Sequence, residues 1–166
     1  MAPRHSTAAA LAALLLAGCA SHVAGVAGPY KASSLRPYEV NGQVYQPRIV
    51  SRYEQVGLAS WYDYPEHSRR TAIGEWFEGG RLTAAHKTLP LPCLVEVTNL
   101  DNGRTIQVRV NDRGPFAPGR IIDLSRAAAD QLGFSDKGLA RVRVRFLGPA
   151  GGAPEIGLAG VTPADG

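Results

Sequence analysis

Residues 94–110 read LVEVTNLDNGRTIQVRV, and this stretch decides the fold class. Apolar and polar residues alternate on both sides of Asn102-Gly103, which is the period-two pattern of strands that bury one face. Asn-Gly is the favoured pair for a tight hairpin turn, because both turn positions need positive φ. The stretch therefore predicts an antiparallel β-hairpin that turns at Asn102-Gly103.

The residues that follow this hairpin add further strands and one short helix. Residues 121–124 form an apolar run, Ser125 is a suitable helix N-cap, and Gly133 is a suitable end of that helix. Residues 139–147 alternate again, and their polar face is either simply solvated or a contact for an anionic polymer. That face carries Arg141, Arg143 and Arg145. Short strands, Gly and Pro turns, and one or two short helices predict a mainly β barrel.

The start of the chain has the pattern of a secretion signal. A basic residue, Arg4, precedes an Ala- and Leu-rich run that ends in LAGC at 16–19. The run is about ten residues long, and a membrane-spanning helix needs about twenty, so residues 1–18 are expected to be a signal peptide. LAGC resembles the lipobox of bacterial lipoproteins, which implies a lipid on Cys19. Cys93 then has no disulfide partner and is expected to be a buried strand residue.

Composition divides the remaining chain into four segments. Residues 19–37 are expected to be a lipidated tether, and residues 38–56 an arm that packs on the domain, because aromatic and aliphatic residues return there. Residues 57–148 are the expected folded domain. Residues 149–166 are rich in Gly, Ala and Pro and are expected to be a disordered tail. The net charge of +4 is too small to indicate nucleic acid as a partner.

Three polar segments carry the candidate chemistry. Each places an ionisable side chain beside small or turn residues, which suits a cleft where backbone and ligand approach closely. The segments are TAIGE at 71–75, LTAAHKTLP at 82–90 and VNDRGPF at 110–116.

Together with ASWY at 59–62, VTNL at 97–100 and RIIDLS at 120–125, these segments resemble the rare lipoprotein A family of peptidoglycan lytic transglycosylases. The resemblance covers about residues 57–146 and implies a six-stranded double-psi β-barrel. The chain departs from the family pattern at three positions, none of them a proposed catalytic residue. These are Asp63, Ile73 and Cys93.

The resemblance also implies an activity and its residues. The family cleaves MurNAc-GlcNAc bonds endolytically to give 1,6-anhydroMurNAc ends and needs no cofactor, and Glu75, His86 and Asp112 match its catalytic positions. Because the acceptor is the C6 hydroxyl of the same sugar, one acid that becomes a base is enough, and Asp112 is expected to fill that role. His86 and Glu75 would position the sugar, stabilise charge or share the proton.

Each of these residues also fits a structural role. Asp112 fits a cap of the Gly-Pro turn, Glu75 a solvated loop residue, and His86 a hydrogen-bonded structural histidine. Trp61 and Tyr62 fit either a sugar-stacking platform or core packing. Asn111 and Arg113, on either side of Asp112, are the other expected substrate-binding residues.

Other chemistries fit the sequence less well. A metal site is not expected, because the three catalytic candidates lack paired-histidine spacing, and no serine lies in a nucleophile elbow. The alternative function is a non-catalytic, expansin-like protein that binds peptidoglycan. The expected partners are glycan strands, already stripped of peptides, and a membrane reached through the lipid. By resemblance to lipoprotein sorting in enteric bacteria, Ala20 after the lipidated cysteine favours the outer membrane, facing the periplasm. The protein is expected to be a monomer.

Overall fold

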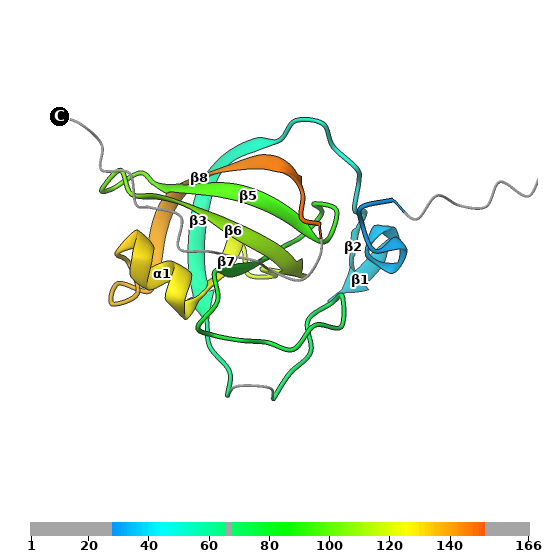
Figure 1. Ribbon diagram of the computed structural model, residues 1–166, viewed down its shortest axis with the longest axis horizontal. Helices are drawn as coiled ribbons and strands as arrows, with labels where there is room; N and C mark the ends of the chain where they lie inside the picture. The colour runs from blue at the N-terminus through cyan, green and yellow to red at the C-terminus, as the bar shows by residue number, and fades with distance from the viewer. Residues whose placement is uncertain (1–27, 66–67, 152–166) are drawn as a thin grey trace, which may run out of the picture.

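The computed structural model describes residues 28–65 and 68–151. The expected signal peptide, Cys19 and residues 152–166 of the expected tail lie outside these ranges. Six strands close a barrel in the order β3-β7-β4-β6-β5-β8 (Figure 1). The barrel strands are β3 (Glu54–Tyr62), β4 (Thr83–His86), β5 (Cys93–Asn99), β6 (Thr105–Asp112), β7 (Arg120–Ser125) and β8 (Leu139–Pro149).

The strand pairing crosses over twice. β3 pairs with β7 and β4 pairs with β6 in parallel, whereas the other four neighbouring pairs of the barrel are antiparallel. A parallel pair needs a crossover connection, so the barrel is not a simple up-and-down arrangement of neighbouring strands. The expected six-stranded double-psi β-barrel, mainly β with short helices, is confirmed.

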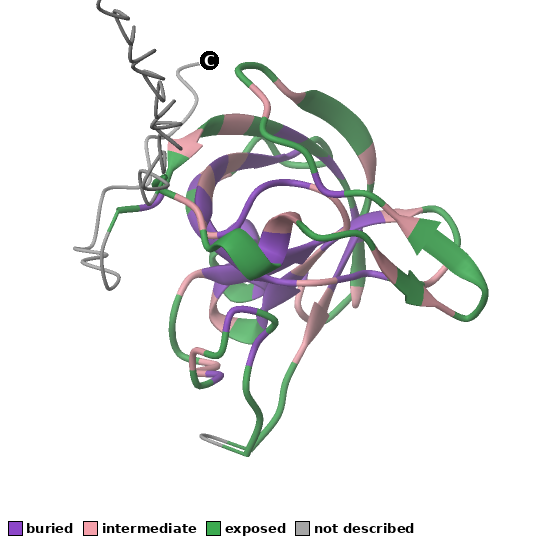
Figure 2. Cartoon of the chain, turned by 90° about the vertical axis from the view of Figure 1, so that its right-hand side faces the viewer, coloured by how far each residue is buried: buried purple, intermediate pink, exposed green. Residues whose placement is uncertain are grey.

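Alternating valines fill the inside of the barrel. The fully buried members are Val95, Val97, Val108, Val110, Val142 and Val144. Successive side chains of a strand point to opposite faces, so every second residue of β5, β6 and β8 enters the core. Figure 2 shows buried segments gathered in the barrel strands and exposed segments in the surrounding loops.

The predicted hairpin is confirmed, but the predicted turn is wrong. β5 and β6 pair from Cys93↔Val110 to Thr98↔Thr105. Within the described connection only Gly103 has a positive φ, 74°, and its N–H donates to the Asn99 carbonyl at 2.8 Å. The five-residue loop at 100–104 therefore replaces a two-residue turn.

A two-residue Asn-Gly turn lies elsewhere, in the arm. Asn41 and Gly42 have φ values of 52° and 78°, and they join β1 (Tyr38–Val40) to β2 (Gln43–Tyr45). The arm is thus an antiparallel hairpin that precedes the barrel. β3 begins at Glu54, three residues before the expected domain boundary at Gly57, because Glu54 and its neighbours already pair with β8.

Part of the expected tether packs on the barrel. A short 3-10 helix, η1 (Ala32–Leu35), carries Ser34, which is buried and donates a hydrogen bond to the Leu91 carbonyl at 3.0 Å. The Lys31 N–H also donates to that carbonyl, at 2.7 Å. Residues 30–34 at the end of the expected tether therefore pack on the barrel, through these polar contacts and the packing of Tyr30 on the core.

The expected tail also starts too early. Pro149 pairs with Cys93 at the end of β8, and the buried Ala150 donates its N–H to the Pro92 carbonyl at 3.2 Å. These two residues extend the barrel, so the expectation of disorder from residue 149 is wrong for them.

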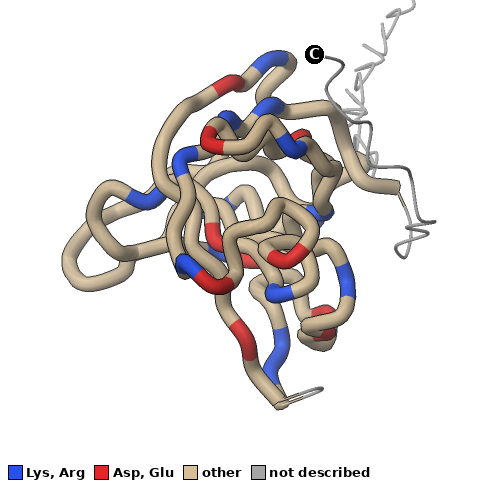
Figure 3. The backbone as a smooth tube through the Cα atoms, turned by 90° about the vertical axis from the view of Figure 1, so that its left-hand side faces the viewer, with Lys and Arg blue, Asp and Glu red and all other residues tan. Residues whose placement is uncertain are grey.

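The predicted helix is confirmed as α1 (Arg126–Leu132). The Ser125 hydroxyl accepts from the Ala128 N–H, and Gly133 closes the helix with a φ of 71°. With seven residues α1 is short, and no helix within the described part of the chain is long and apolar enough to cross a bilayer. Figure 3 shows positive and negative segments interspersed on the face it displays, in keeping with the small net charge.

Candidate active site

Asp112 lies at the end of β6 on the wall of an open groove of about 270 Å³. Its side chain is 6% exposed and accepts three hydrogen bonds. The backbone N–H groups of Ala72 and Arg113 both donate to Oδ1 at 2.8 Å, and the Arg69 guanidinium donates to Oδ2 at 2.9 Å. Oδ1 is therefore fixed by the backbone. Oδ2 is bound by the Arg69 side chain, which is 41% exposed.

A second carboxylate, Asp123 of β7, lines the same groove. Ala85 on β4 is the register partner of Asp112 on one side and of Asp123 on the other. With strands about 4.8 Å apart, the two aspartates are about 10 Å apart at Cα. Burial raises the pKa of Asp123 above its usual value, although Ser60 donates a hydrogen bond to Oδ1 at 2.5 Å. The groove thus holds two carboxyl groups in different environments, with one methyl side chain between them.

Aromatic side chains line this groove. Tyr62 and Tyr64 contribute two rings whose centroids are 5.8 Å apart, and Phe116 contributes a third ring that is 38% exposed. Gly114 lies beside Ala85 and Phe116 and has a φ of 132°, which only glycine adopts without strain. The groove thus combines aromatic rings with charged side chains, among them Asp112, Arg113 and Asp123.

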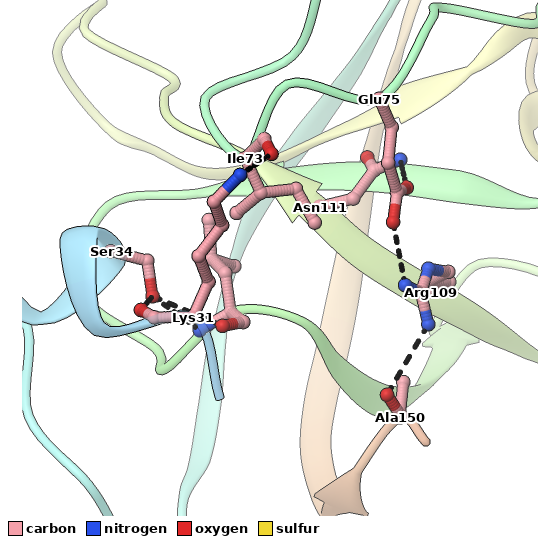
Figure 4. A network of polar contacts seen from close by, with 8 residues as sticks. Lys31, Ser34, Ile73, Glu75, Arg109, Asn111 and Ala150 are labelled. Atoms are coloured by element: carbon pink, nitrogen blue, oxygen red, sulfur yellow. Dashed lines mark hydrogen bonds and ion pairs between the residues drawn. The ribbon is translucent and has the colours of Figure 1, made fainter. Parts of the chain in front are cut away.

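Glu75 does not line this groove and instead neutralises a buried arginine (Figure 4). Arg109 is 4% exposed and donates to Glu75 Oε1 at 2.7 Å, and Asn111 donates to Oε2 at 2.8 Å. Burial raises the pKa of Glu75, but the two hydrogen bonds and the positive charges of Arg109 and Arg81 together outweigh it, so that the net pKa lies below the usual value. Removing one partner of a buried ion pair commonly lowers the free energy of unfolding by about 3 kcal/mol. Glu75 is therefore expected to stabilise the fold.

His86 is also turned away from the groove. The imidazole is 3% exposed, and its Nδ1 accepts the N–H groups of Thr88 and Leu89 at 3.1 and 3.0 Å. Nε2 therefore carries the proton and donates to the Tyr53 hydroxyl at 2.9 Å. Tyr53 lines a separate hollow, together with Arg48. Burial, with the positive charges of Arg113 and Lys87, lowers the pKa of His86 to about 3.

This environment predicts how His86 affects stability as the pH changes. The unfolded imidazole binds a proton near pH 6.5, whereas the folded one stays neutral down to about 3. The free energy of unfolding should therefore fall as the pH falls through this window, by up to about 1.4 kcal/mol per pH unit from this residue. Denaturant unfolding of wild type and His86→Asn at a series of pH values measures the difference in slope. Equal slopes would contradict the burial of a neutral His86.

The expected substrate-binding residues divide into two groups. Tyr62 and Arg113 line the groove, whereas Trp61 and Asn111 do not. The Trp61 indole donates to the Ser135 carbonyl at 2.9 Å, and Asn111 belongs to the Glu75 network. The Arg113 guanidinium is used by three backbone carbonyls, which belong to His86, Leu89 and Ser34.

Cys93 is a structural residue. It is fully buried at the start of β5, and burial raises the pKa of its thiol to about 12. The expectation of a buried strand cysteine is therefore confirmed. A thiol with a raised pKa is also a poor nucleophile. Among residues 28–65 and 68–151, no three His, Cys, Asp or Glu side chains gather closely enough to hold a metal ion. The chemistry this groove offers is proton transfer between two carboxyl groups and a bound substrate.

Sequence comparisons place the chain among known proteins. A family model described as lytic transglycolase matches residues 54–144. A relative from Pseudomonas aeruginosa strain UCBPP-PA14 is 54% identical over 114 residues, which are 68% of this chain and 33% of the relative. Relatives from Neisseria meningitidis serogroup A and Yersinia pestis are 49% and 47% identical, over 74% and 81% of this chain and 52% and 38% of their own length. All three are named endolytic peptidoglycan transglycosylase RlpA.

The chain thus spans between a third and about half of the length of these relatives. Among solved structures, Streptomyces papain inhibitor aligns with a TM-score of 0.47 and 27% identity, over 57% of this chain and 94% of the inhibitor. The expansin of Clavibacter michiganensis aligns with a TM-score of 0.48 and 18% identity, over 60% of this chain and 53% of the expansin.

Proposed function

The chain belongs to the lytic transglycolase family, and from this premise we propose that it is an endolytic peptidoglycan lytic transglycosylase. It cleaves MurNAc-GlcNAc bonds within glycan strands and leaves 1,6-anhydroMurNAc ends. The observation that supports this most is the pair of carboxyl groups, Asp112 and Asp123, on either side of Ala85 in one groove with aromatic walls. Both aspartates lie within the matched residues 54–144.

The environments of the two carboxyl groups favour different roles. The sequence alone assigned both proton transfers to Asp112. Asp123 is the better acid, because burial raises its pKa and so favours the protonated form. Asp112 is the candidate base, since two backbone N–H groups hold Oδ1 in place and Oδ2 faces the partly exposed Arg69 at the groove. The exposed Arg69 can leave Oδ2 free to accept a hydrogen bond from an incoming hydroxyl.

The reaction then balances without water. Asp123 gives its proton to the glycosidic oxygen as the bond from that oxygen to C1 of MurNAc breaks. The C6 hydroxyl of the same MurNAc attacks C1, and Oδ2 of Asp112 takes the hydroxyl proton. The proton returns from Asp112 to Asp123 through solvent, because the groove is open. Glu75 and His86 act as positioning residues, which hold the strands that carry Asp112 and Ala85.

The site of action follows from the substrate and from the N-terminus. Peptidoglycan strands lie in the cell envelope, so the protein works there. A lipid on Cys19 would keep the domain at a membrane, and Ala20 favours the outer one, facing the periplasm. Both residues lie outside the described part of the chain, and the lipid anchor rests on the LAGC sequence.

Strand shortening tests this function. The full chain is incubated with purified glycan strands that either keep their stem peptides or have lost them to an amidase, and strand length is then measured. We expect internal fragments from the stripped strands, as endolytic cleavage requires. Binding of both substrates without any shortening would contradict the enzyme and favour a wall-binding protein.

A further inference from the structure

The hairpin β1–β2 lies before the residues matched by the family model and beside the barrel (Figure 1). Its tight turn at Asn41-Gly42 pairs Tyr38 directly with Tyr45. The two rings are stacked with centroids 5.3 Å apart and planes 19° apart. Val44 is the neighbour of Tyr45 in β2, so its side chain points to the opposite face, where it is 59% exposed.

Contacts with the barrel hold the hairpin in a fixed position. The Tyr38 hydroxyl donates to the Lys87 carbonyl at 2.8 Å, and the Arg113 guanidinium lies 5.8 Å from the centre of the Tyr38 ring. The Arg48 N–H, just after the hairpin, donates to the Thr88 carbonyl at 3.0 Å. Tyr38 therefore attaches the hairpin to the barrel. Among the described residues the Tyr45 hydroxyl makes no hydrogen bond, and Tyr45 contacts Tyr38 and Phe116 only through its ring.

The Tyr45 ring continues the aromatic wall of the groove. Its centroid is 5.5 Å from that of Phe116, which lines the groove, and the planes are tilted by 56°. Tyr38 meets Phe116 edge-on at 6.2 Å. Aromatic rings thus continue from Phe116, which lines the groove, to Tyr45, which does not.

We propose that Tyr45 and Phe116 form an additional subsite for a sugar ring of the glycan strand, beyond the sugars bound at Asp112. A pyranose ring has a flat face of C–H groups that packs on aromatic rings, and a polymer long enough to leave the groove passes over this surface. The proposal rests on the proposed function, because it takes the strand as the ligand. It predicts that affinity increases when the strand is long enough to reach Tyr45.

Binding as a function of strand length tests the subsite. The full chain carries Asp112→Asn to prevent cleavage, and affinities are measured for peptide-free glycans from one repeating disaccharide upward. We expect the gain in affinity with length to shrink by about threefold to tenfold in Tyr45→Ala, the usual range for an aromatic contact. Tyr45→Phe should keep the gain, because the ring remains. Val44→Ala, on the other face of the same strand, is the matched control.

The outcomes separate the two proposals. If Tyr45→Ala shows the same gain with length as Val44→Ala, the subsite proposal is overturned. The same holds if Tyr45→Ala weakens short and long glycans equally, since the hairpin would then only support the groove. If the chain with intact Tyr45 binds no glycan of any length, and the wild type shortens no strand, the proposed function itself fails.

Discussion

Asp112→Asn is expected to lower the rate of glycan cleavage by about 10²- to 10⁴-fold, the usual contribution of a general acid or base. The substitution keeps the size of the side chain, and the amide oxygen can still accept the two backbone N–H groups now bound to Oδ1. The amide nitrogen that replaces Oδ2 cannot accept a proton from the C6 hydroxyl. Strand shortening per folded molecule, with the melting temperature from the same preparation, measures the effect.

Asp136→Asn is the matched control for this change, because it removes the same charge from an exposed position after α1. It should leave cleavage at the wild-type rate. If Asp112→Asn keeps its melting temperature and cleaves as fast as Asp136→Asn, Asp112 is not catalytic. A loss of stability of about 0.5–2 kcal/mol with normal activity would instead identify Asp112 as a turn cap.

The second large effect is expected at Asp123, where Asp123→Asn should slow cleavage of glycan strands by at least about 10²-fold. The amide oxygen still accepts from Ser60, so the groove should keep its shape. The variant can no longer donate a proton to the leaving glycosidic oxygen. That loss should matter little when the leaving group is a good one.

An aryl glycoside of MurNAc tests this role, because a nitrophenolate leaves without being protonated. The defect of Asp123→Asn should largely disappear with this substrate, while the defect of Asp112→Asn should persist. Asp123 must also be protonated to act, so wild-type activity on glycan strands should fall as the pH rises through its raised pKa. Equal defects of Asp123→Asn on both substrates would refute its role as the acid.

The barrel strands could be predicted from the sequence because their burial follows the two-residue period of a strand. In β8, for example, Val142 and Val144 are fully buried while Arg141 and Arg143 are exposed. The turn between β5 and β6 was predicted less accurately than the strands. Asn-Gly is a strong turn signal only when strands flank it directly, as at Asn41-Gly42, where the strands are only three residues long and lack a clear pattern.

The candidate active site could be predicted only in part. Asp112 stands in a distinctive local segment, NDRGPF, and does line the groove. Asp123 joins it only because β4 pairs with both β6 and β7, and these pairings link residues far apart in the sequence. No local sequence pattern indicates which distant strands will pair. RIIDLS at 120–125 carried part of the family resemblance, but its aspartate was not recognised as a site residue.

His86 and Glu75 show a different limit of the sequence. Their residue types suit catalysis, but the direction of each side chain decides its role. His86 points at the backbone of Thr88 and Leu89, and Glu75 points at the buried Arg109. The structural role considered for His86 matches this geometry, and the solvated role considered for Glu75 does not.

The most direct test of the account is the chemistry of the new strand ends. Peptide-free glycan is digested by the full chain in water enriched in oxygen-18, and the fragments are weighed by mass spectrometry. Transfer to the C6 hydroxyl predicts ends that are one water lighter than a reducing MurNAc and carry no heavy oxygen. Asp112→Asn should form these ends about 10²- to 10⁴-fold more slowly. Reducing ends that contain oxygen-18 would contradict the account, because they would show that water attacks C1 and that the enzyme is a hydrolase.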